Sequence, residues 1–187
     1  MIQLVHLLSL QKDKAMLELI ELSAPYRDSF LTGLRELQAD GQLLYYDVAS
    51  ISADFGAFVQ SLQHNKDRTK IPANRVPDVD YWLYENDSIL LGHLSLRYKL
   101  NAYMLQLGGH IGYQICPSQR RQGYGKIILQ LGLEKARAIG LQRVLVTCDE
   151  NNLGSKKIIE ANGGQLENAI LLEGNSIRKL RYWIDIA

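Results

Sequence analysis

A short glycine-containing tract carries the clearest chemistry in this sequence. It reads Arg120-Arg121-Gln122-Gly123-Tyr124-Gly125-Lys126 and lies between a strand-like segment ending at Pro117 and a helix-like segment ending near Gly140. Glycines let a backbone approach a ligand closely, and a helix that starts here turns N–H groups and its positive dipole end toward that ligand. We therefore predict a site for a phosphate-bearing molecule.

Two common phosphate-binding motifs do not fit this tract. An ATPase-type loop needs a glycine five residues before Gly125, where the chain has Arg120, and Ser or Thr after the lysine, where it has Ile127. A dinucleotide fingerprint needs a third glycine three residues after Gly125, where Ile128 stands. A solvated basic turn before a helix explains a lone Gly-x-Gly pair equally well, so the interpretation depends on the surrounding elements.

The composition fits one folded domain with a substantial core. Of the 187 residues 47% are hydrophobic, and 21 Lys and Arg residues nearly balance 20 Asp and Glu residues, giving a net charge of +1. Such a chain has no general electrostatic attraction to nucleic acid or anionic lipid. No segment approaches the roughly 18 consecutive apolar residues of a membrane-spanning helix. We expect a soluble protein that binds neither nucleic acid nor membranes.

The two cysteines and the first residues bear on the compartment. The segment 1–5 lacks the basic residues of a secretory leader, and a charged run at 11–14 interrupts the apolar stretch. Cys116 and Cys148 lie far apart in the sequence, so we expect a reduced, cytoplasmic protein. Both thiols lie in apolar strand-like runs, where a buried, unreactive cysteine is more typical than a nucleophile.

Hydrophobic spacing places the tract within a series of predicted elements. Before position 79 most of it has helical spacing, with a polar connection at 65–78; from Val79 the period changes to two. For the helix near 52–64, Ser52 or Asp54 would be the cap. The first part contains a predicted strand at 2–8 and predicted helices at 13–22, 26–38 and 52–64. The second part contains predicted strands at 81–85, 88–98, 110–115, 141–148, 165–172 and 176–186, with helices at 124–139 and from Asn152 to Gly163.

The order of these motifs resembles the acetyl-CoA site of the GNAT family of N-acetyltransferases. Arg120-x-x-Gly123-x-Gly125 follows the strand-like run 115–117 and precedes a further strand and the helix start Asn152-x-x-Ser155. The resemblance covers about 82–187. The tracts 108–113 and 148–152 are similar to a bacterial subgroup of predicted acetyltransferases.

The resemblance implies an α/β (α+β) fold. Its central sheet would be mixed and mostly antiparallel, with one splayed parallel strand pair and helices on both faces. We expect a single domain over 1–187, with a divergent helical part at 1–78 and the acetyl-CoA-binding core and C-terminal hairpin at 79–187. Exposed edges of that hairpin would allow a homodimer.

The resemblance also implies how acetyl-CoA, the expected cosubstrate, would bind; no metal is expected. The backbone from Gln122 to Lys126 would hold the diphosphate, with basic side chains balancing its charge. The pantetheine arm would lie along the strand at Ile115, and Asn152 would face the same gap, although an ordinary helix cap explains Asn152 as well. The expected cosubstrate-binding residues are Ile115, Cys116, Arg120, Arg121, Gln122, Gly123, Tyr124, Gly125, Lys126, Asn152 and Ser155.

The implied reaction is direct attack of a primary amine, from a small molecule or a peptide, on the thioester carbonyl. An amine with a pKa near ~10 is mostly protonated at neutral pH, so a base or a water relay must free its lone pair. Relatives often have a Glu at the strand position that His110 occupies here, and histidine could serve as that base, although a backbone-paired strand-end histidine is the plainer alternative. Asp149 and Glu150 are the alternative bases, unless they are only solvated turn carboxylates.

The resemblance leaves the proton donor for the leaving thiol open. Relatives often place a Tyr seven residues after the Asn of the second helix, and here that position is Ile159. Tyr113 could substitute, and a thiolate also leaves without an acid. A backbone N–H near Ile115 or Cys116 would stabilise the oxyanion. A catalytically silent acyl-CoA sensor is the alternative that would explain the missing Tyr.

Overall fold

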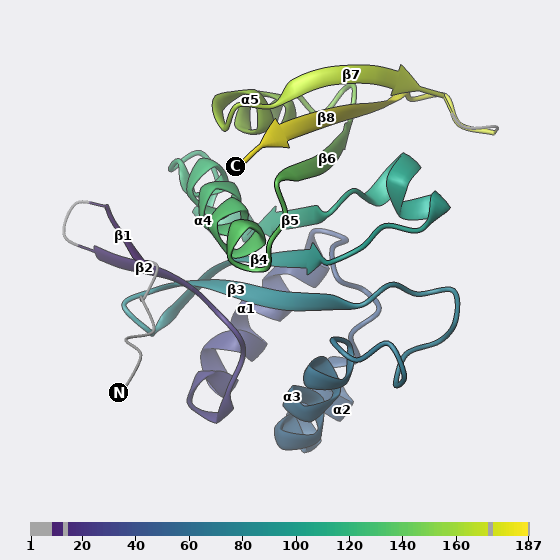
Figure 1. Cartoon of the computed structure of the whole chain (residues 1–187). Helices are drawn as coiled ribbons and strands as arrows, with labels where there is room; N and C mark the ends of the chain where they lie inside the picture. The colour runs from purple at the N-terminus through teal and green to yellow at the C-terminus, as the bar shows by residue number, and fades with distance from the viewer. Residues whose placement is uncertain (1–8, 13–14, 172–173, 187) are drawn as a thin grey trace, which may run out of the picture.

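The computed structural model describes residues 9–12, 15–171 and 174–186 (Figure 1). The strand predicted at 2–8 lies outside the described residues. The strands are β1 (Ser9–Lys12), β2 (Ala15–Ile20), β3 (Asp78–Glu85), β4 (Ile89–Arg97), β5 (Ile111–Ile115), β6 (Arg143–Asp149), β7 (Gln165–Ile170) and β8 (Lys179–Asp185). The α-helices are α1 (Arg27–Ala39), α2 (Val48–Ala53), α3 (Phe55–His64), α4 (Tyr124–Ala138) and α5 (Leu153–Ala161). Short 3₁₀ turns occupy Ala24–Tyr26 and Pro117–Gln119, and a π-helical turn occupies Met104–Gly108.

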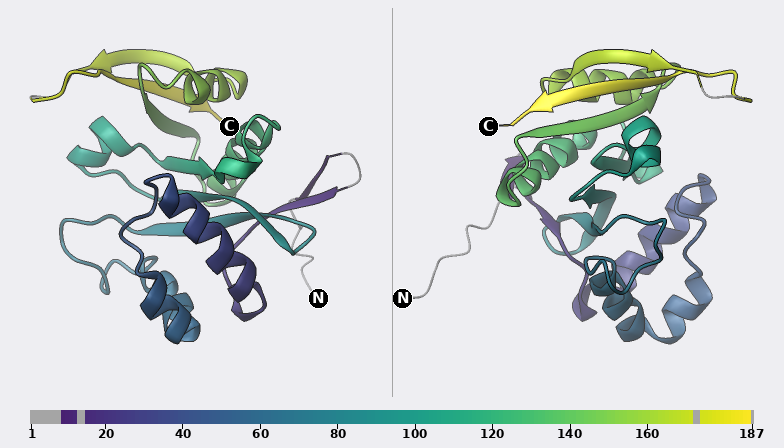
Figure 2. Two further views of the ribbon diagram at one scale, coloured as in Figure 1. Left: turned by 180° about the vertical axis from the view of Figure 1, so that it is seen from behind. Right: turned by 45° about the vertical axis from the view of Figure 1, so that its right-hand side comes forward.

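The strands of the described chain form one sheet with the order β1-β2-β3-β4-β5-β6-β8-β7. Every neighbouring pair in it is antiparallel except β5 and β6. Helices α1, α2 and α3 cover one face, and α4 and α5 cover the other (Figure 2). The expected mixed, mostly antiparallel sheet with helices on both faces is therefore confirmed.

Alternation along the strands divides the core between these two faces. In β3, Tyr81 and Leu83 belong to the cluster under α4, whereas Trp82 and Tyr84 belong to the cluster with α1 to α3. The same alternation in β5 turns Tyr113 and Ile115 toward the α4 and α5 face. Residues Gly112 and Gln114 therefore lie on the opposite face, and this division decides which side chains meet at the site.

The parallel pair β5 and β6 is joined at only one end. Its register consists of a single residue pair, Ile111 with Val146, while β6 pairs along its length with β8. One residue earlier, the amide of His110 donates to the Leu145 carbonyl oxygen at 2.7 Å. Beyond Ile111 the two strands separate, so a gap opens between them toward the start of α4 (Figure 1).

Gly109 makes the closed end of this gap possible. Its φ of +62° lies in the region that side chains rarely adopt. A Cβ atom at this position would lie 2.4 Å from the Leu145 carbonyl oxygen, closer than any real contact. The backbone of the chain before β5 can therefore reach β6 only because this residue is glycine.

Two of the predicted helices are wrong in detail. The segment 13–22 is not helical where it is described: it contains β2, with Leu17 and Leu19 fully buried on either side of the partly exposed Glu18. That alternation has period two, and pairing with β3 favours it over the weaker helical spacing. The N-terminal part is therefore not only helical, because β1 and β2 extend the sheet.

The helix predicted at 52–64 is two helices. They are separated at Asp54, whose side chain accepts a hydrogen bond from the Ala57 amide at 2.9 Å and so caps α3. Asp54 is thus the cap, and Ser52 lies inside α2. The helix predicted at 26–38 and the hairpin of β3 and β4 are confirmed with small shifts of their ends. No helix in the described ranges is both long and apolar enough to cross a membrane.

Candidate functional site

A cavity of about 490 Å³ occupies the gap between β5 and β6. Its lining comes from β5, the loop before α4, and the start of α5, and it reaches both faces of the sheet, since Tyr113 and Gln114 both contribute. The lining residues are Asp40, Gln42, Tyr113, Gln114, Ile115, Gln119, Arg120, Arg121, Gly125, Asn152, Gly154, Ser155 and Ile158. The cavity thus brings together most of the residues predicted to bind the cosubstrate.

Gly123 is the N-cap of helix α4 and lies between Arg121 and Gly125, which both line the cavity. Its φ of +88° is left-handed, and a Cβ atom built on it would meet no atom within 4 Å. The first turn of a helix directs backbone N–H groups and the positive dipole end outward, which favours an anion. Gly123 has no side chain that could cap these groups, so the first turn of α4 is suited to a phosphate.

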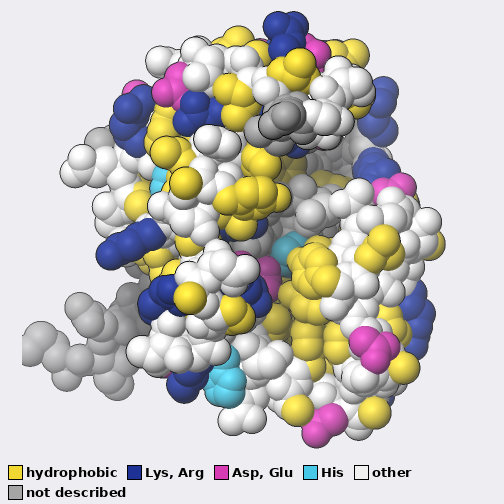
Figure 3. All heavy atoms as spheres, turned by 90° about the vertical axis from the view of Figure 1, so that its right-hand side faces the viewer, with side chains coloured by type: hydrophobic (Ala, Val, Ile, Leu, Met, Phe, Trp, Pro, Cys, Tyr) yellow, Lys and Arg dark blue, Asp and Glu magenta, His cyan; other side chains and the backbone are white. Residues whose placement is uncertain are grey.

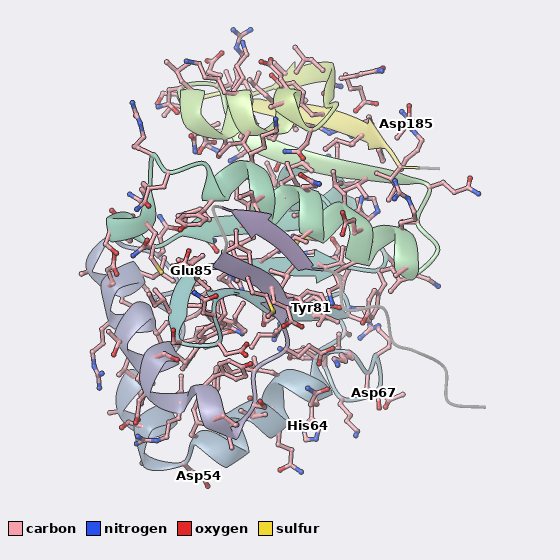
Figure 4. All side chains as sticks on the ribbon, turned by 90° about the vertical axis from the view of Figure 1, so that its left-hand side faces the viewer. Asp54, His64, Asp67, Tyr81, Glu85 and Asp185 are labelled. Atoms are coloured by element: carbon pink, nitrogen blue, oxygen red, sulfur yellow. The ribbon has the colours of Figure 1, made fainter. Side chains whose placement is uncertain are left out.

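Gly125 is required for a different reason. A Cβ atom on it would lie 2.5 Å from the Cδ1 atom of Ile158, so this glycine lets α4 and α5 pack closely. Between the two glycines, Tyr124 turns its side chain into the core, and its hydroxyl donates to Glu85 at 2.9 Å. Figure 4 shows Glu85 at the end of β3, beside the first turn of α4. Tyr124 can therefore contribute only its backbone to the cavity.

The basic side chains around the tract differ in what they contact. Arg120 forms an ion pair with Asp40 and also donates from Nε to the Ile115 carbonyl oxygen at 3.2 Å. Hydrogen bonding from Arg120 lowers the pKa of Asp40, so this pair is already neutralised. Arg121 and Lys126 are exposed, and Arg121 lines the cavity. Of the predicted phosphate-balancing cations, Arg121 is the one best placed.

The backbone of β5 presents hydrogen-bonding groups to the gap. In an antiparallel ladder, successive residues point their N–H and C=O groups alternately toward and away from the partner strand. The Cys116 amide donates to the Leu91 carbonyl oxygen at 2.9 Å and is therefore used by β4. The alternation directs the amides of Tyr113 and Ile115 away from β4, toward the gap. Ile115, rather than Cys116, has the geometry predicted for a strand-like ligand contact.

Asn152 and Ser155 line the far wall of the cavity at the start of α5. The side-chain oxygen of Asn152 accepts a hydrogen bond from the Ser155 amide at 3.0 Å, which is an ordinary N-cap. Gln122, the remaining polar residue of the tract, is exposed and donates to Gln119 and Ser118. Asn152 therefore has a structural role that also brings Ser155 to the cavity.

His110 does not have the geometry of a general base. Its Nδ1 atom accepts a hydrogen bond from the Leu145 amide at 2.9 Å, so the ring proton is on Nε2 and no lone pair is left for a substrate proton. Burial, together with the charge of Arg97, lowers the pKa of His110 to about 4. We therefore replace the predicted catalytic role: His110 joins β5 to β6 at the closed end of the gap.

Tyr113, the other predicted catalytic side chain of β5, lines the cavity. Its hydroxyl oxygen is buried and makes no hydrogen bond of normal geometry within the described structure, although the residue lines the cavity opposite Ser155. Burial raises the pKa of Tyr113 to about 12, against an opposing effect of Ser155. A buried hydroxyl without a hydrogen bond is rare, so its position calls for an explanation. Ile159, where relatives often have a Tyr, is fully buried in the core.

The acidic residues after β6 do not face the cavity. Glu150 pairs with Arg178 at 2.8 Å, and hydrogen bonding from Arg178 lowers the pKa of this carboxyl. Asp149 pairs with Lys179 and lines a second cavity of about 410 Å³ instead. Burial raises the pKa of Cys116 to about 12 and also raises the pKa of Cys148, as expected for unreactive thiols. The geometry therefore does not support Glu150 as the base.

Sequence reasoning missed a buried polar network on the face of α1 to α3. His93 of β4 lies between Asp80 of β3, with Nε2 and Oδ1 2.7 Å apart, and Gln114 of β5, with Nδ1 and Oε1 2.9 Å apart. The Tyr46 hydroxyl donates to the other oxygen of Asp80 at 3.1 Å. The signal was present in the sequence, because polar residues recur at every second position of otherwise apolar strands, at 78 and 80 and at 93, 95 and 97. Within the described ranges, no group of His, Cys, Asp or Glu side chains is arranged to hold a metal ion.

Comparison with known proteins gives a family match and several similar structures. A family model described as an acetyltransferase (GNAT) domain matches residues 34–165. A ribosomal L7/L12 α-N-protein acetyltransferase solved with coenzyme A has a TM-score of 0.63 at 19% identity, covering 90% of this chain and 93% of that one. An acetyltransferase from Salmonella typhimurium that modifies the N-terminal serine of L7/L12 has a TM-score of 0.62 at 19% identity, covering 91% and 95%.

A third similar structure has a different specificity. The microcin C7 self-immunity acetyltransferase MccE, solved with acetyl-CoA and AMP, has a TM-score of 0.62 at 13% identity and covers 93% of each chain. No curated protein matches the chain at the level of sequence. At these identities the solved structures establish a shared fold, while the family model covers most of the chain.

Proposed function

The chain belongs to the GNAT acetyltransferase family, and on this premise we propose that it acetylates a primary amine of a peptide or small molecule by direct attack in a ternary complex. It is an acetyl-CoA-dependent acetyltransferase. The observation that carries the proposal is the cavity in the gap between β5 and β6, which joins the start of α4 to both faces of the sheet. Both the cosubstrate and the acceptor amine would bind in this cavity.

The residues present fit a coenzyme A thioester. The first turn of α4 at Gly123 suits the diphosphate, and Arg121 is exposed beside it. The amides of Tyr113 and Ile115 suit an extended amide-containing arm that runs along β5 as an additional strand would. When bound, acetyl-CoA supplies an acetyl group as a reactive thioester. The chain itself supplies backbone groups and an enclosed wall.

The acceptor would enter from the face of α1 to α3. The space-filling view of the right-hand edge of Figure 1 shows a hollow at its centre, with acidic and histidine side chains visible inside (Figure 3). On this face the Asp78 Oδ1 atom is buried without a hydrogen bond in the described structure, and Arg75 approaches it only to 3.6 Å. Burial and the neighbouring charge of Asp80 raise the pKa of Asp78. Acidic groups favour a cationic acceptor such as an ammonium group.

A peptide α-amino group is the first acceptor to test. Two of the similar structures are enzymes of ribosomal protein L7/L12, and one of them is described as modifying its N-terminal serine. A peptide terminus is a cationic amine at the end of a narrow chain, which suits an open hollow above an acidic floor. Peptides with free N-termini should therefore be tested as acceptors together with aminoacyl and sugar amines.

Proton movement would rely on water and on Tyr113. Among the described residues that line the cavity, Asp40 is the carboxylate present, and its ion pair with Arg120 makes it a poor base. The amine proton would therefore leave through water in the open hollow. Tyr113, protonated at neutral pH because burial raises its pKa to about 12, would donate a hydrogen bond to the departing sulfur.

A thiol-release assay tests the proposal. Purified protein is incubated with acetyl-CoA and a panel of peptides with free N-termini, amino acids, aminoacyl nucleotides and aminoglycosides, and calorimetry measures acetyl-CoA binding. We expect saturable acetyl-CoA binding and thiol release that depends on at least one amine. Binding without release across the panel would favour the silent acyl-CoA sensor, and no binding at all would refute the proposed site.

A further inference from the structure

The buried Asp80–His93 pair is linked to the wall of the cavity through Gln114. His93 and Asp80 are 2% and 9% exposed, and neither lines the cavity. Gln114 is directly opposite His93 in the ladder of β4 and β5 and does line it. Hydrogen bonds therefore run from the core of the α1 to α3 face to the edge of the gap. An interaction of this kind, buried and fully paired, fixes side-chain geometry.

The partners of His93 determine which groups it presents. Asp80 accepts from Tyr46 as well as from His93, and although burial raises its pKa, the charge and hydrogen bond of His93 outweigh this and lower it. The Nε2 atom of His93 lies against the Asp80 carboxylate and its Nδ1 atom against the Gln114 carboxamide, so each ring nitrogen has one partner. His93 therefore has no unpartnered ring nitrogen that could act as a base, and it holds the Gln114 carboxamide in place like a clamp.

This clamp leaves one part of Gln114 available to the cavity. Its Oε1 atom is held by His93, so the two N–H donors of its carboxamide remain for a ligand. Gln114 also lies between the open mouth of the gap at α4 and its closed end at Ile111. A thioester anchored by its diphosphate at α4 and extended along β5 has its acyl end toward that closed end.

On these grounds we propose that Gln114 is a catalytic residue whose side-chain N–H group donates to the carbonyl oxygen of the acyl group, and that Asp80 and His93 are positioning residues that aim it. The inference rests on the proposed function and names a side-chain donor that would polarise the thioester carbonyl. A fixed donor that meets developing negative charge lowers the barrier most when it is already oriented. The backbone amide of Ile115 would be the second donor on the gap side.

The test begins with Gln114→Glu, which keeps an acceptor for His93 but has no N–H donors. We expect kcat to fall by about a hundredfold with a smaller change in KM. Calorimetry gives a readout that does not need turnover. The wild type should bind acetyl-CoA more tightly than coenzyme A. In the variant the ratio of the two affinities should fall about fivefold. An unchanged kcat and an unchanged preference would overturn the inference.

A double-mutant cycle separates positioning from a general structural role. If Asp80 acts through Gln114, Asp80→Asn lowers kcat in the wild type but not further in a Gln114→Ala background. Equal fractional losses in both backgrounds would contradict the positioning role. Ser29→Ala is the matched control, because the Ser29 hydroxyl lies on the same face of the sheet and bonds Tyr84 rather than this network. It should leave kcat near the wild-type value.

A measurement on the wild-type protein covers the case in which Asp80→Asn does not fold. Nitrogen-15 NMR of the His93 ring should show a proton on Nδ1 in the ligand-free protein, because the Gln114 Oε1 atom that faces it can only accept. A free lone pair on Nδ1 would mean that Gln114 turns its carbonyl oxygen to the cavity, which would overturn the inference. Failure of the wild type to bind acetyl-CoA would instead refute the proposed function, so the two failures are distinguishable.

Discussion

The cavity is lined by different kinds of groups on the two faces of the sheet. On the face of α4 and α5 the wall comes from β5 and from the starts of α4 and α5, and it combines backbone groups with the side chains of Tyr113, Arg121 and Ser155. On the face of α1 to α3 it consists of side chains, with Gln114 held by residues from two other strands. The first wall suits a ligand that every family member shares, because backbone geometry does not depend on side-chain identity. The second wall can differ from one protein to the next.

The comparison also separates what holds the gap open from what fills it. Gly109 and His110 fix the closed end through close contact and hydrogen bonds to Leu145. Helix α4 and its glycines define the open end. Changes at one end should therefore alter stability, and changes at the other should alter binding.

The largest effect should follow from Gly123→Glu. A carboxylate at the first turn of α4 would repel the diphosphate, so we expect acetyl-CoA affinity to fall about a thousandfold, about 4 kcal/mol. The matched control is Gly140→Glu at the other end of α4. Gly140 has a φ of +87°, like the +88° of Gly123, and a Cβ atom would meet nothing at either position. Both variants should lose stability, more at position 140 because a carboxylate opposes the helix dipole there, and calorimetry should find the binding loss only at position 123.

Acid stability should depend on His110. The unfolded chain takes up a proton near pH 6.5, whereas burial holds the pKa of His110 at about 4 in the folded protein. Stability is therefore complete above about pH 6.5 and falls as the pH drops toward 4, by about 3 kcal/mol in total. His110→Asn keeps an acceptor for the Leu145 amide without the titration. Urea unfolding at several pH values should show this loss in the wild type and not in the variant; parallel curves would count against the assignment.

Tyr113→Phe should separate activity from stability. We expect kcat to fall about tenfold, because the departing sulfur loses a hydrogen-bond donor but still leaves as a thiolate. The melting temperature should be unchanged or slightly higher, since the hydroxyl has no hydrogen bond of normal geometry to lose in the described structure. A large loss of stability with unchanged kcat would show that the hydroxyl is structural.

The smallest effect should come from the cap of α5. Asn152→Ala removes the acceptor for the Ser155 amide and should cost about 1 kcal/mol of stability. Asn152→Asp restores the cap but adds a negative charge to the cavity wall. If Asn152 also faces the ligand, the Asp variant recovers stability and binds acetyl-CoA more weakly than the wild type. Full recovery of both properties would make Asn152 a cap alone.

Local signals explain what the sequence could predict. The start of α4, the Asn152 cap and the hairpin of β3 and β4 depend on neighbouring residues, so their positions follow from short patterns. The spacing at 13–22 predicts a helix in place of strand β2, because the alternation of this strand is short and is stabilised by pairing with β3, a contact distant in sequence. Local spacing cannot report such pairing.

The catalytic side chains were harder to predict for the same reason. The role of His110 depends on Leu145, 35 positions away, and the partners of His93 lie 13 and 21 positions away. The sequence alone therefore cannot tell whether a histidine on a strand face is a base, a positioning residue or a structural residue. Alternating polar residues in β3 and β4 did mark the face on which a network would form.

The most direct test of the account is an amide chemical-shift titration with acetyl-CoA. If the coenzyme lies in the gap, the largest saturable shifts should appear at Tyr113 and Ile115 in β5 and at 123–126 at the start of α4. The second cavity, which Tyr103 and Lys179 line, should stay unchanged. Shifts confined to that second cavity, or an unperturbed start of α4 at saturating acetyl-CoA, would contradict the central claim.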